Sequence, residues 1–429
     1  MVVCPSLDCE QVKRLFIRRM SERGRVRSVL ALLVACISCE RAASADSTFV
    51  VRDSAGIQIV ENPIPEPAPV CSVATEPTMT IGETEGTDPY LLHRVTDALV
   101  LDGGNIVIGA DGVYDVRMFG EDGKYLHSFG RRGEGPGEFR NIMLLFALGA
   151  DTIVVEDYRP WRLSYFTADG EFLRAVVPQP LSVNRPDHAV LRRDGTIVSG
   201  HDCCLLREPG FHPQVLHLVL HDRDGVFVDT IGEYPFGAYG LLPDAGRDGS
   251  FISPLFESFT TVAGYGMNTI IGDQAKQELV ILGENLEPSI LLRWQVAGRE
   301  GPLEVRRSDV EAYRERRIAA MTPANRQFVE EDVSPDRPVS ERFPAFAGIV
   351  AANDGAIALR LYRRPADPEV DTYLLFDRDQ RFVCTLKLST RRRIWRLGTD
   401  HALLHEIGDM DVERLARYAL IRPARAERP

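Results

Sequence analysis

A repeated unit of two β-hairpins constrains the fold of this 429-residue sequence more than any other feature. The first hairpin of the unit is an apolar run, a short turn and another apolar run. In the second, alternating apolar positions flank an acidic turn, where Asp-Gly supplies the positive φ angles of a tight hairpin. Copies of the first hairpin lie at residues 98–109, 144–155, 189–200, 260–272, 348–360 and 394–406. Copies of the second lie at residues 116–130, 163–177, 216–232, 279–294 and 373–388.

Each unit supplies about four antiparallel strands, and the first three units recur every ~46 residues, counted from Gly104, Ala150 and Gly195. A small sheet with this alternating pattern needs cover on both faces. Neighbouring sheets provide that cover when the units stand around a common axis. The sequence therefore predicts an all-β fold over residues 53–429, a six-bladed β-propeller of four-stranded antiparallel blades.

The sixth unit has a third strand at residues 415–421 but lacks a convincing fourth. Near the other end of the chain, residues 55–63 and 73–82 have strand-like patterns and no unit of their own. An N-terminal strand that pairs with the last blade would close the ring and remove its exposed edges. We expect the ring to be closed in this way.

Residues 299–342 interrupt the repeat with a charged, helical pattern. Ser308 and Glu311 have the spacing of a capping box, and Thr322-Pro323 is expected to start a second short helix. We expect a helical insertion between blades four and five that packs over one mouth of the channel. The expected apolar face of the first helix consists of Val310, Tyr313, Ile318 and Met321.

The N-terminal segment has the pattern of an export signal. Five arginines between residues 18 and 27 precede an apolar stretch at 29–35, which is too short to span a bilayer. The stretch ends in Leu33-Val34-Ala35-Cys36, which resembles the lipobox of bacterial lipoproteins, where the cysteine receives the lipid and becomes the N-terminus. We expect residues 1–35 to be a lipoprotein signal peptide that truly starts at Met20, Cys36 to be the lipidation site, and residues 36–52 to be a polar tether.

Two alternatives to this interpretation remain open. The apolar stretch could be a buried strand with an incidental cysteine, and Cys39 is a second candidate for lipidation. In the favoured interpretation the protein is anchored in the cell envelope, at the outer membrane or facing the periplasm, and touches the membrane through its lipid only. The envelope permits disulfides. The sequence leaves open whether Cys71 pairs with Cys384 or Cys203 with Cys204.

The formal net charge of the chain is −12, and removal of an arginine-rich leader makes the remainder still more acidic. A chain of this charge has no general affinity for nucleic acid or for anionic lipid headgroups. We therefore expect no nucleic-acid partner.

The stretch "GRRGEGPGEF" at residues 130–139 is unusually rich in glycine. We interpret it as the corner between two blades, where glycines permit positive φ angles, Pro136 stiffens one turn and Phe139 fills the gap between sheets. A phosphate-binding loop is the alternative. It is disfavoured because no Gly-Lys-Ser/Thr follows and no helix begins there.

This corner and the following "TIVVEDYRPWRLSYFTADGEFL" resemble the NHL-type repeat of six-bladed propellers. From "DSAGIQIVENP" onward the chain also resembles a group of bacterial secreted or lipid-anchored proteins that are described only as six-bladed β-propellers. The resemblance implies the fold and an envelope location. The asparagine that the repeat usually has is absent near Pro160, and blades four to six diverge from the pattern. The matching positions of the repeat are Gly137, Phe139, Asp157, Arg162 and Phe166.

Ligands of propellers usually lie at the central channel, beside the first strand of each blade. Alignment of the six first strands places Asp97, Leu144, His188, Thr261, Gly348 and Arg393 at one comparable position, and Glu257 one turn earlier. We take Asp97, His188, Glu257 and Arg393 as candidate ligand-binding residues. The alternative is that these are ordinary solvated or salt-bridged strand ends.

We find no catalytic, metal-ligating or cofactor-binding pattern. The nine histidines form no cluster with metal-ligand spacing, and neither Gly-x-Ser-x-Gly nor His-Glu-x-x-His occurs. We predict a module that binds a protein, a peptide or a small polar ligand and has no catalysis of its own. One alternative is a metal-dependent hydrolase or lyase at the channel mouth, and another is an assembly platform in the outer membrane.

Overall fold

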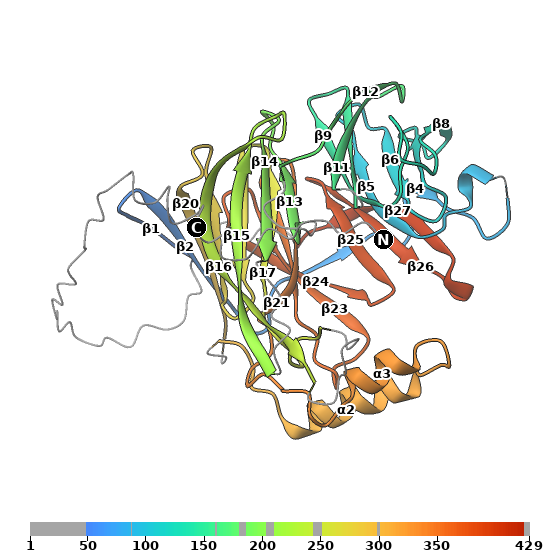
Figure 1. Ribbon diagram of the computed structural model, residues 1–429. Coiled ribbons are helices and arrows are strands. Elements are labelled where there is room, and N and C mark those ends of the chain that lie inside the picture. The colour runs from blue at the N-terminus through green and yellow to red at the C-terminus, as the bar shows by residue number, and fades with distance from the viewer. Residues whose placement is uncertain are drawn as a thin grey trace. The chain divides into compact units, whose positions relative to one another are not determined.

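The computed structural model describes residues 49–86, 88–158, 161–179, 186–202, 210–242, 251–297 and 301–423 (Figure 1). The expected signal peptide, Cys36 and both Cys203 and Cys204 lie outside the described residues. Of the expected tether only residues 49–52 are described, and the first strand already begins at Val50.

The chain is mostly β-structure, and its repeated hairpins form four-stranded antiparallel sheets in chain order, as the sequence predicts. Sheet 1 contains β5 (Val95–Val100), β6 (Ile106–Ala110), β7 (Asp115–Phe119) and β8 (Tyr125–Phe129). Sheet 2 contains β9 (Ile142–Leu148), β10 (Thr152–Asp157), β11 (Arg162–Thr167) and β12 (Phe172–Val176). Sheet 3 contains β13 (His188–Leu191), β14 (Ile197–Asp202), β15 (Gly210–His221) and β16 (Phe227–Leu241).

The second half of the chain repeats this order. Sheet 4 contains β17 (Thr260–Tyr265), β18 (Asn268–Asp273), β19 (Glu278–Leu282) and β20 (Pro288–Val296). Sheet 5 contains β21 (Phe346–Ala351), β22 (Ile357–Leu361), β23 (Val370–Phe376) and β24 (Phe382–Ser389). Sheet 6 contains β25 (Arg392–Leu397), β26 (His401–Ile407) and β27 (Glu413–Ile421), and its fourth strand comes from the N-terminal segment.

The N-terminal segment forms four strands, and the last three of them pair with the last strands of sheets 4, 5 and 6. The four strands are β1 (Val50–Ser54), β2 (Ile57–Ile64), β3 (Val70–Val73) and β4 (Met79–Ile81). β4 pairs antiparallel with β27 and completes sheet 6, as expected for residues 73–82. β2 instead pairs parallel with β20, and β3 lies between β24 and β27, joining sheets 5 and 6 into one hydrogen-bonded sheet.

Asn62 shows how this segment joins neighbouring sheets. Its side chain is buried and donates to the backbone carbonyls of Arg293 in sheet 4 (3.2 Å) and of Gln380 in sheet 5 (3.1 Å). Its oxygen accepts the N–H of Phe382 at 2.8 Å. One buried amide with all of these partners therefore bridges two sheets and fixes the path of β2.

Buried apolar side chains pack between each sheet and the next, and the series returns from sheet 6 to sheet 1. Val107 of sheet 1 shares a cluster with Val155 of sheet 2, and Ile106 of sheet 1 shares another with Leu403 of sheet 6. Further clusters join sheets 2 and 3, 3 and 4, 4 and 5, and 5 and 6. Each sheet thus has the two covered faces that its alternating pattern requires.

A disulfide joins Cys71 of β3 to Cys384 of β24, across 313 positions of sequence. Both cysteines are buried. We expect the Cys71→Ser/Cys384→Ser variant to lose about 2–4 kcal/mol of unfolding free energy, because the bond restricts the unfolded chain across a long loop. Urea denaturation followed by tryptophan fluorescence measures the loss. Reductant should lower the wild-type midpoint and leave that of the variant unchanged; equal midpoints for the two oxidised proteins would contradict the expectation.

The insertion lies between β20 and β21 and contains α2 (Arg307–Ala319) and α3 (Arg326–Asp332). The expected capping box is wrong, because Ser308 and Glu311 both lie inside α2. The carboxylate of Asp309 accepts the N–H of Arg306 instead, at 3.0 Å. Ile318 is exposed, so it does not belong to the packed face, and α3 begins at Arg326 rather than at Pro323.

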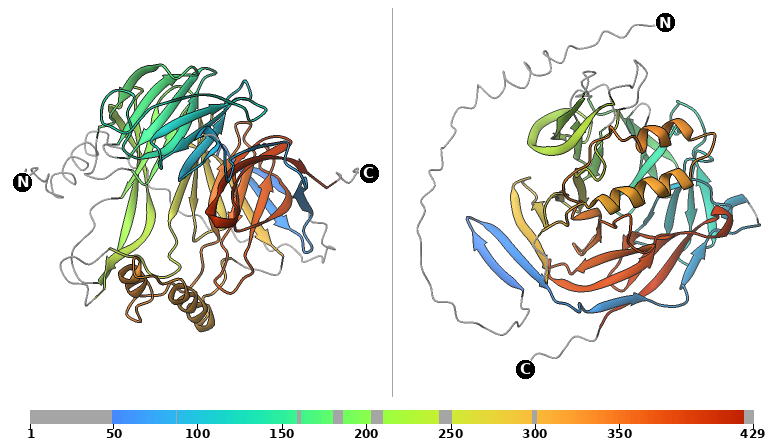
Figure 2. Two further views of the ribbon diagram at one scale, coloured as in Figure 1. Left: turned by 90° about the vertical axis from the view of Figure 1, so that its right-hand side faces the viewer. Right: turned by 90° about the horizontal axis from the view of Figure 1, so that it is seen from below.

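The insertion packs on the loops that lead into sheets 4 and 5. Leu255, Phe256 and Phe343 form a cluster against Val310 and Tyr313 of α2. The carboxylate of Asp332 ties α3 to α2 through Tyr313 and Arg317 and to the following loop through Arg337. In Figure 1 both helices lie below the sheets, and in the right-hand view of Figure 2 they cross in front of the lower ends of the sheets.

Candidate functional site

The glycine-rich loop 130–139 is held as a corner between sheets 1 and 2. Arg162 of β11 donates to the backbone carbonyls of Glu134 (3.0 Å) and Glu138 (2.6 Å) and to the carboxylate of Asp157 (3.0 Å). Asp157 in turn accepts two backbone N–H groups just after the loop, from Arg140 and Asn141. Asp157 and Arg162 therefore hold the backbone of this turn in place, as expected for a corner between two sheets.

Asp97 and His188 form contacts between neighbouring first strands. The carboxylate of Asp97 in β5 accepts the N–H of Leu145 in β9 (3.0 Å) and a guanidinium N–H of Arg396 in β25 (2.9 Å). Nε2 of His188 in β13 lies 3.0 Å from the carbonyl oxygen of Thr260 in β17. A ligand that bound either side chain would have to displace these contacts.

Glu257 precedes β17 and faces the insertion. Its carboxylate accepts a hydrogen bond from the hydroxyl of Ser340 at 2.8 Å. Burial raises the pKa of Glu257 above its usual range, because the charged form loses solvation. The structure therefore brings Glu257 to the same end of the sheets as the insertion, but it does not place Glu257 beside Asp97.

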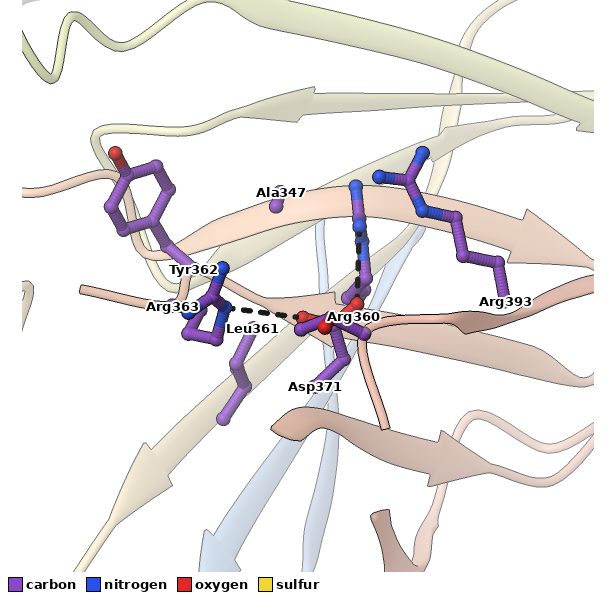
Figure 3. A pocket seen from close by; sticks show the side chains of 8 residues that line it. Ala347, Arg360, Leu361, Tyr362, Arg363, Asp371 and Arg393 are labelled. Atoms are coloured by element: carbon purple, nitrogen blue, oxygen red, sulfur yellow. Dashed lines mark hydrogen bonds and ion pairs between the residues drawn. The ribbon is translucent and has the colours of Figure 1, made fainter. Parts of the chain in front are cut away.

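Arg393 is exposed at the start of β25 and lines a pocket with a volume of about 190 Å³ (Figure 3). The pocket lies where β21 and β25 begin and β22 and β24 end. The residues that line it are Ala347, Arg360, Leu361, Tyr362, Arg363, Asp371, Thr390 and Arg393. Of the candidate residues from the sequence, Arg393 is the one that lines this pocket.

The pocket has charged groups that alignment of the first strands could not show. Asp371 of β23 lies between two arginines, with an oxygen 3.4 Å from Nη1 of Arg360 and another 3.8 Å from Nε of Arg363 (Figure 3). Arg360 pairs with Gly348 across β21 and β22, and its guanidinium lies over that glycine. In the sequence, these charged groups were indicated only by the run of Arg360, Arg363 and Arg364 at the end of a strand.

Tyr362 contributes an aromatic wall to the pocket. Its ring stacks on Phe343 of the insertion loop, with centroids 5.6 Å apart. Burial raises the pKa of Tyr362 to about 12, so the phenol is a neutral hydrogen-bond donor at physiological pH. The pocket thus joins sheet 5, sheet 6 and the insertion.

A buried polar cluster lies apart from the pocket, between sheets 2 and 3. The hydroxyl of Ser199 is 2.8 Å from Nε2 of His201 and 3.5 Å from Nδ1 of His221. The indole of Trp161 packs edge-on against both imidazoles. These side chains are all at most 8% exposed, so the serine and histidines have a packing role rather than access to a substrate.

Acid should destabilise the fold through His201. Burial and the neighbouring His221 lower the pKa of His201 to about 3, whereas an unfolded histidine titrates near 6.5. The stabilising effect of the neutral imidazole is complete above pH ~6.5 and is lost as the pH falls from there toward 3. We expect a loss of about 2 kcal/mol at pH 5 relative to pH 7.5.

Urea denaturation of the wild type and the His201→Gln variant at both pH values measures this effect. The comparison is needed because burial raises the pKa of Asp115 and Asp202, which acts in the opposite direction on acidification. The variant should show a smaller difference between the two pH values. A difference as large as that of the wild type would exclude His201 as the cause.

Among residues 49–423 as far as the structure describes them, no three His, Cys, Asp or Glu side chains are grouped to hold a metal ion. In the same part of the chain no helix is both long enough and apolar enough to cross a bilayer.

No family model and no curated protein matches the sequence. Among solved structures, the chain is similar to a protein of Bacteroides fragilis NCTC 9343, with 12% identity, 85% of this chain and 100% of that chain covered, and a TM-score of 0.49. It is also similar to a member of the DUF4221 family from Bacteroides vulgatus (11%, 82% and 99%, TM-score 0.46) and to the β-propeller domain of Swd1 from Myceliophteria thermophila (15%, 80% and 99%, TM-score 0.38). At these values no activity of this chain follows from the likeness.

Proposed function

We propose that this chain is an exported six-bladed β-propeller with NHL-like corners, anchored in the envelope by a lipid on Cys36, and that it binds a protein, peptide or small polar ligand without catalysis. The cyclic packing of sheets 1 to 6 supports the propeller. Completion of sheet 6 by β4 supports closure of the ring. The insertion then covers part of one mouth.

Two observations support export to the envelope. The leader and its lipobox-like end are in the sequence. A buried disulfide between Cys71 and Cys384 belongs in an oxidising compartment. Expression of the Cys36→Ser variant tests the anchor: the wild type should partition into detergent and carry a diacylglycerol adduct by mass spectrometry, whereas the variant should carry none. An adduct on the variant would show that another residue carries the lipid.

The observation that carries the binding function is the pocket beside Arg393. Asp97 and His188 already bond neighbouring strands, whereas Arg393 is exposed and faces an opening. Small concave sites with a few convergent polar groups are where ligands bind. The pocket is therefore the place where this propeller binds its ligand.

A variant that fills the pocket tests this proposal. Full-length protein is extracted from envelopes and its retained small molecules and peptides are identified by native mass spectrometry. Ala347→Trp should remove the retained ligand, because Ala347 lines the pocket. Ala147→Trp is the matched control, since Ala147 is an exposed alanine on the first strand of sheet 2.

Equal retention by both variants and the wild type would refute the pocket as the binding site, and no retained ligand on the wild type would refute the binding function. Elemental analysis of the same samples addresses the alternative. A stoichiometric, tightly held metal ion together with metal-dependent turnover would refute the non-catalytic binding function and support the metal-dependent hydrolase or lyase.

A further inference from the structure

The pocket is positively charged, although the chain as a whole has a formal net charge of −12. Three guanidinium groups line it, those of Arg360, Arg363 and Arg393, with the carboxylate of Asp371. Arg363 also pairs with Glu369 beside the pocket at 3.1 Å, so the excess positive charge is that of Arg360 and Arg393 over Asp371. The side chain of Asp371 is 7% exposed and is fixed between Arg360 and Arg363. The excess of positive charge in a concave site attracts an anion.

Arg393 differs from the two arginines that precede it in the sequence. Arg391 donates to Asp409 at 3.3 Å, and Arg392 donates to Glu406 at 2.7 Å and lies over the ring of Tyr418. Among the residues that the structure describes, Arg393 has no carboxylate within ion-pair distance. Within the described ranges its guanidinium is therefore the one at the pocket that no carboxylate pairs with.

Arg360 also keeps hydrogen-bonding capacity. Its contact with Asp371 is 3.4 Å, longer than the 2.7–2.9 Å typical of a charge-assisted hydrogen bond. Figure 3 shows the guanidinium groups of Arg360 and Arg393 extending to the same side of the pocket. Two planar groups with unused N–H donors, facing one space, have the geometry that binds a planar anion in a bidentate manner.

Resting on the proposed binding function, we propose that this pocket binds a carboxylate group of the ligand between Arg360 and Arg393, with Tyr362 at its edge. The volume of about 190 Å³ is below the ~300–1,000 Å³ of pockets for whole drug-sized ligands, so the pocket holds one end of the ligand. Asp371 reduces the excess of positive charge in the pocket, and a carboxylate is planar like the two guanidinium groups, whereas a phosphate is tetrahedral. A monoanionic carboxylate therefore fits better than a phosphate.

Isothermal titration of the full-length protein in detergent tests this proposal with three probes: glutarate, its uncharged diamide, and inorganic phosphate. We expect glutarate to bind, the diamide to bind at least about tenfold more weakly, and phosphate to bind more weakly than glutarate. Binding of glutarate should weaken with added salt, because the attraction is electrostatic.

Single substitutions then locate the site. Arg393→Gln should weaken glutarate at least about tenfold, and Arg393→Lys should weaken it less, because lysine keeps the charge but not the planar fork. Arg391→Gln is the matched control, with the same change of charge two positions away, and should alter the affinity less than about twofold. The melting temperature of each variant confirms that it is folded.

Several results would overturn the proposal: a wild type that does not bind glutarate, equal affinities for glutarate and the diamide, tighter binding of phosphate, or equal effects of Arg391→Gln and Arg393→Gln. The binding function is tested separately by Ala347→Trp. If Ala347→Trp loses the retained ligand but Arg393→Gln does not change the affinity for glutarate, the binding function is supported and the carboxylate proposal is refuted.

Discussion

Replacement of Arg162 by methionine is expected to lower the free energy of unfolding by about 3–5 kcal/mol, because the substitution leaves the buried carboxylate of Asp157 without its cation. Asp157 is fully buried, and the side chain of Arg162 is 9% exposed. The same guanidinium also binds the carbonyls of Glu134 and Glu138 in the glycine-rich corner. Urea denaturation measures the loss, and proteolysis within residues 130–139 should become faster.

Arg174→Met is the matched control in the same sheet. Arg174 of β12 pairs with Asp224, and their side chains are 40% and 69% exposed, so the pair contributes at most about 1 kcal/mol. The Asp157→Asn/Arg162→Met double variant should be less destabilised than Arg162→Met alone, because the amide can still accept the two backbone N–H groups and carries no charge. Similar losses for Arg162→Met and Arg174→Met would show that the buried pair does not hold the corner.

Phe139→Ala is the second substitution with a large expected effect, about 3–5 kcal/mol of unfolding free energy. Phe139 is fully buried in the cluster between sheets 1 and 2, where its ring contacts Phe166 at a centroid distance of 5.8 Å. The ring also lies directly against Gly130, where an added Cβ would be 2.3 Å from it. The substitution opens a cavity that the backbone of the corner cannot fill.

Phe172→Ala is the comparison for this cavity. Phe172 contacts the same Phe166 at 5.7 Å, but it is 37% exposed, so its truncation should cost clearly less than that of Phe139. Thermal and urea unfolding of the two variants provide the test. An equal cost for both substitutions would mean that Phe139 does not join the two sheets.

The hairpins were predictable from the sequence because their turns have a local chemical signal. Gly123, Gly170 and Gly225 each follow an aspartate, and all three adopt positive φ angles of 79–82°. The partner of β2 had no such signal. Its alternating apolar pattern predicted a strand, but parallel pairing with β20 joins positions more than 200 residues apart and depends on the completed sheet.

The start of α2 illustrates a different limit. Ser308 and Glu311 satisfied the spacing rule, but the observed box lies two residues earlier, where the carboxylate of Asp309 accepts the backbone N–H of Arg306. Several polar residues in one turn therefore compete for the same role, and tertiary packing selects among them.

The candidate site was predictable only in part. Alignment of first strands found Arg393, but it also selected Asp97 and His188, which contact neighbouring strands. Arg360 and Asp371 were missed because they lie on the second and third strands of sheet 5 and meet Arg393 only when sheets 5 and 6 pack together.

Peptide mapping of the full-length exported chain, alkylated before any reduction, tests whether a disulfide formed in an oxidising compartment joins the N-terminal segment to sheet 5. We expect the peptide that contains Cys71 to be linked to the peptide that contains Cys384, since β3 and β24 hold these cysteines together. Recovery of both cysteines as alkylated free thiols from the exported protein would contradict this closure and the envelope location together.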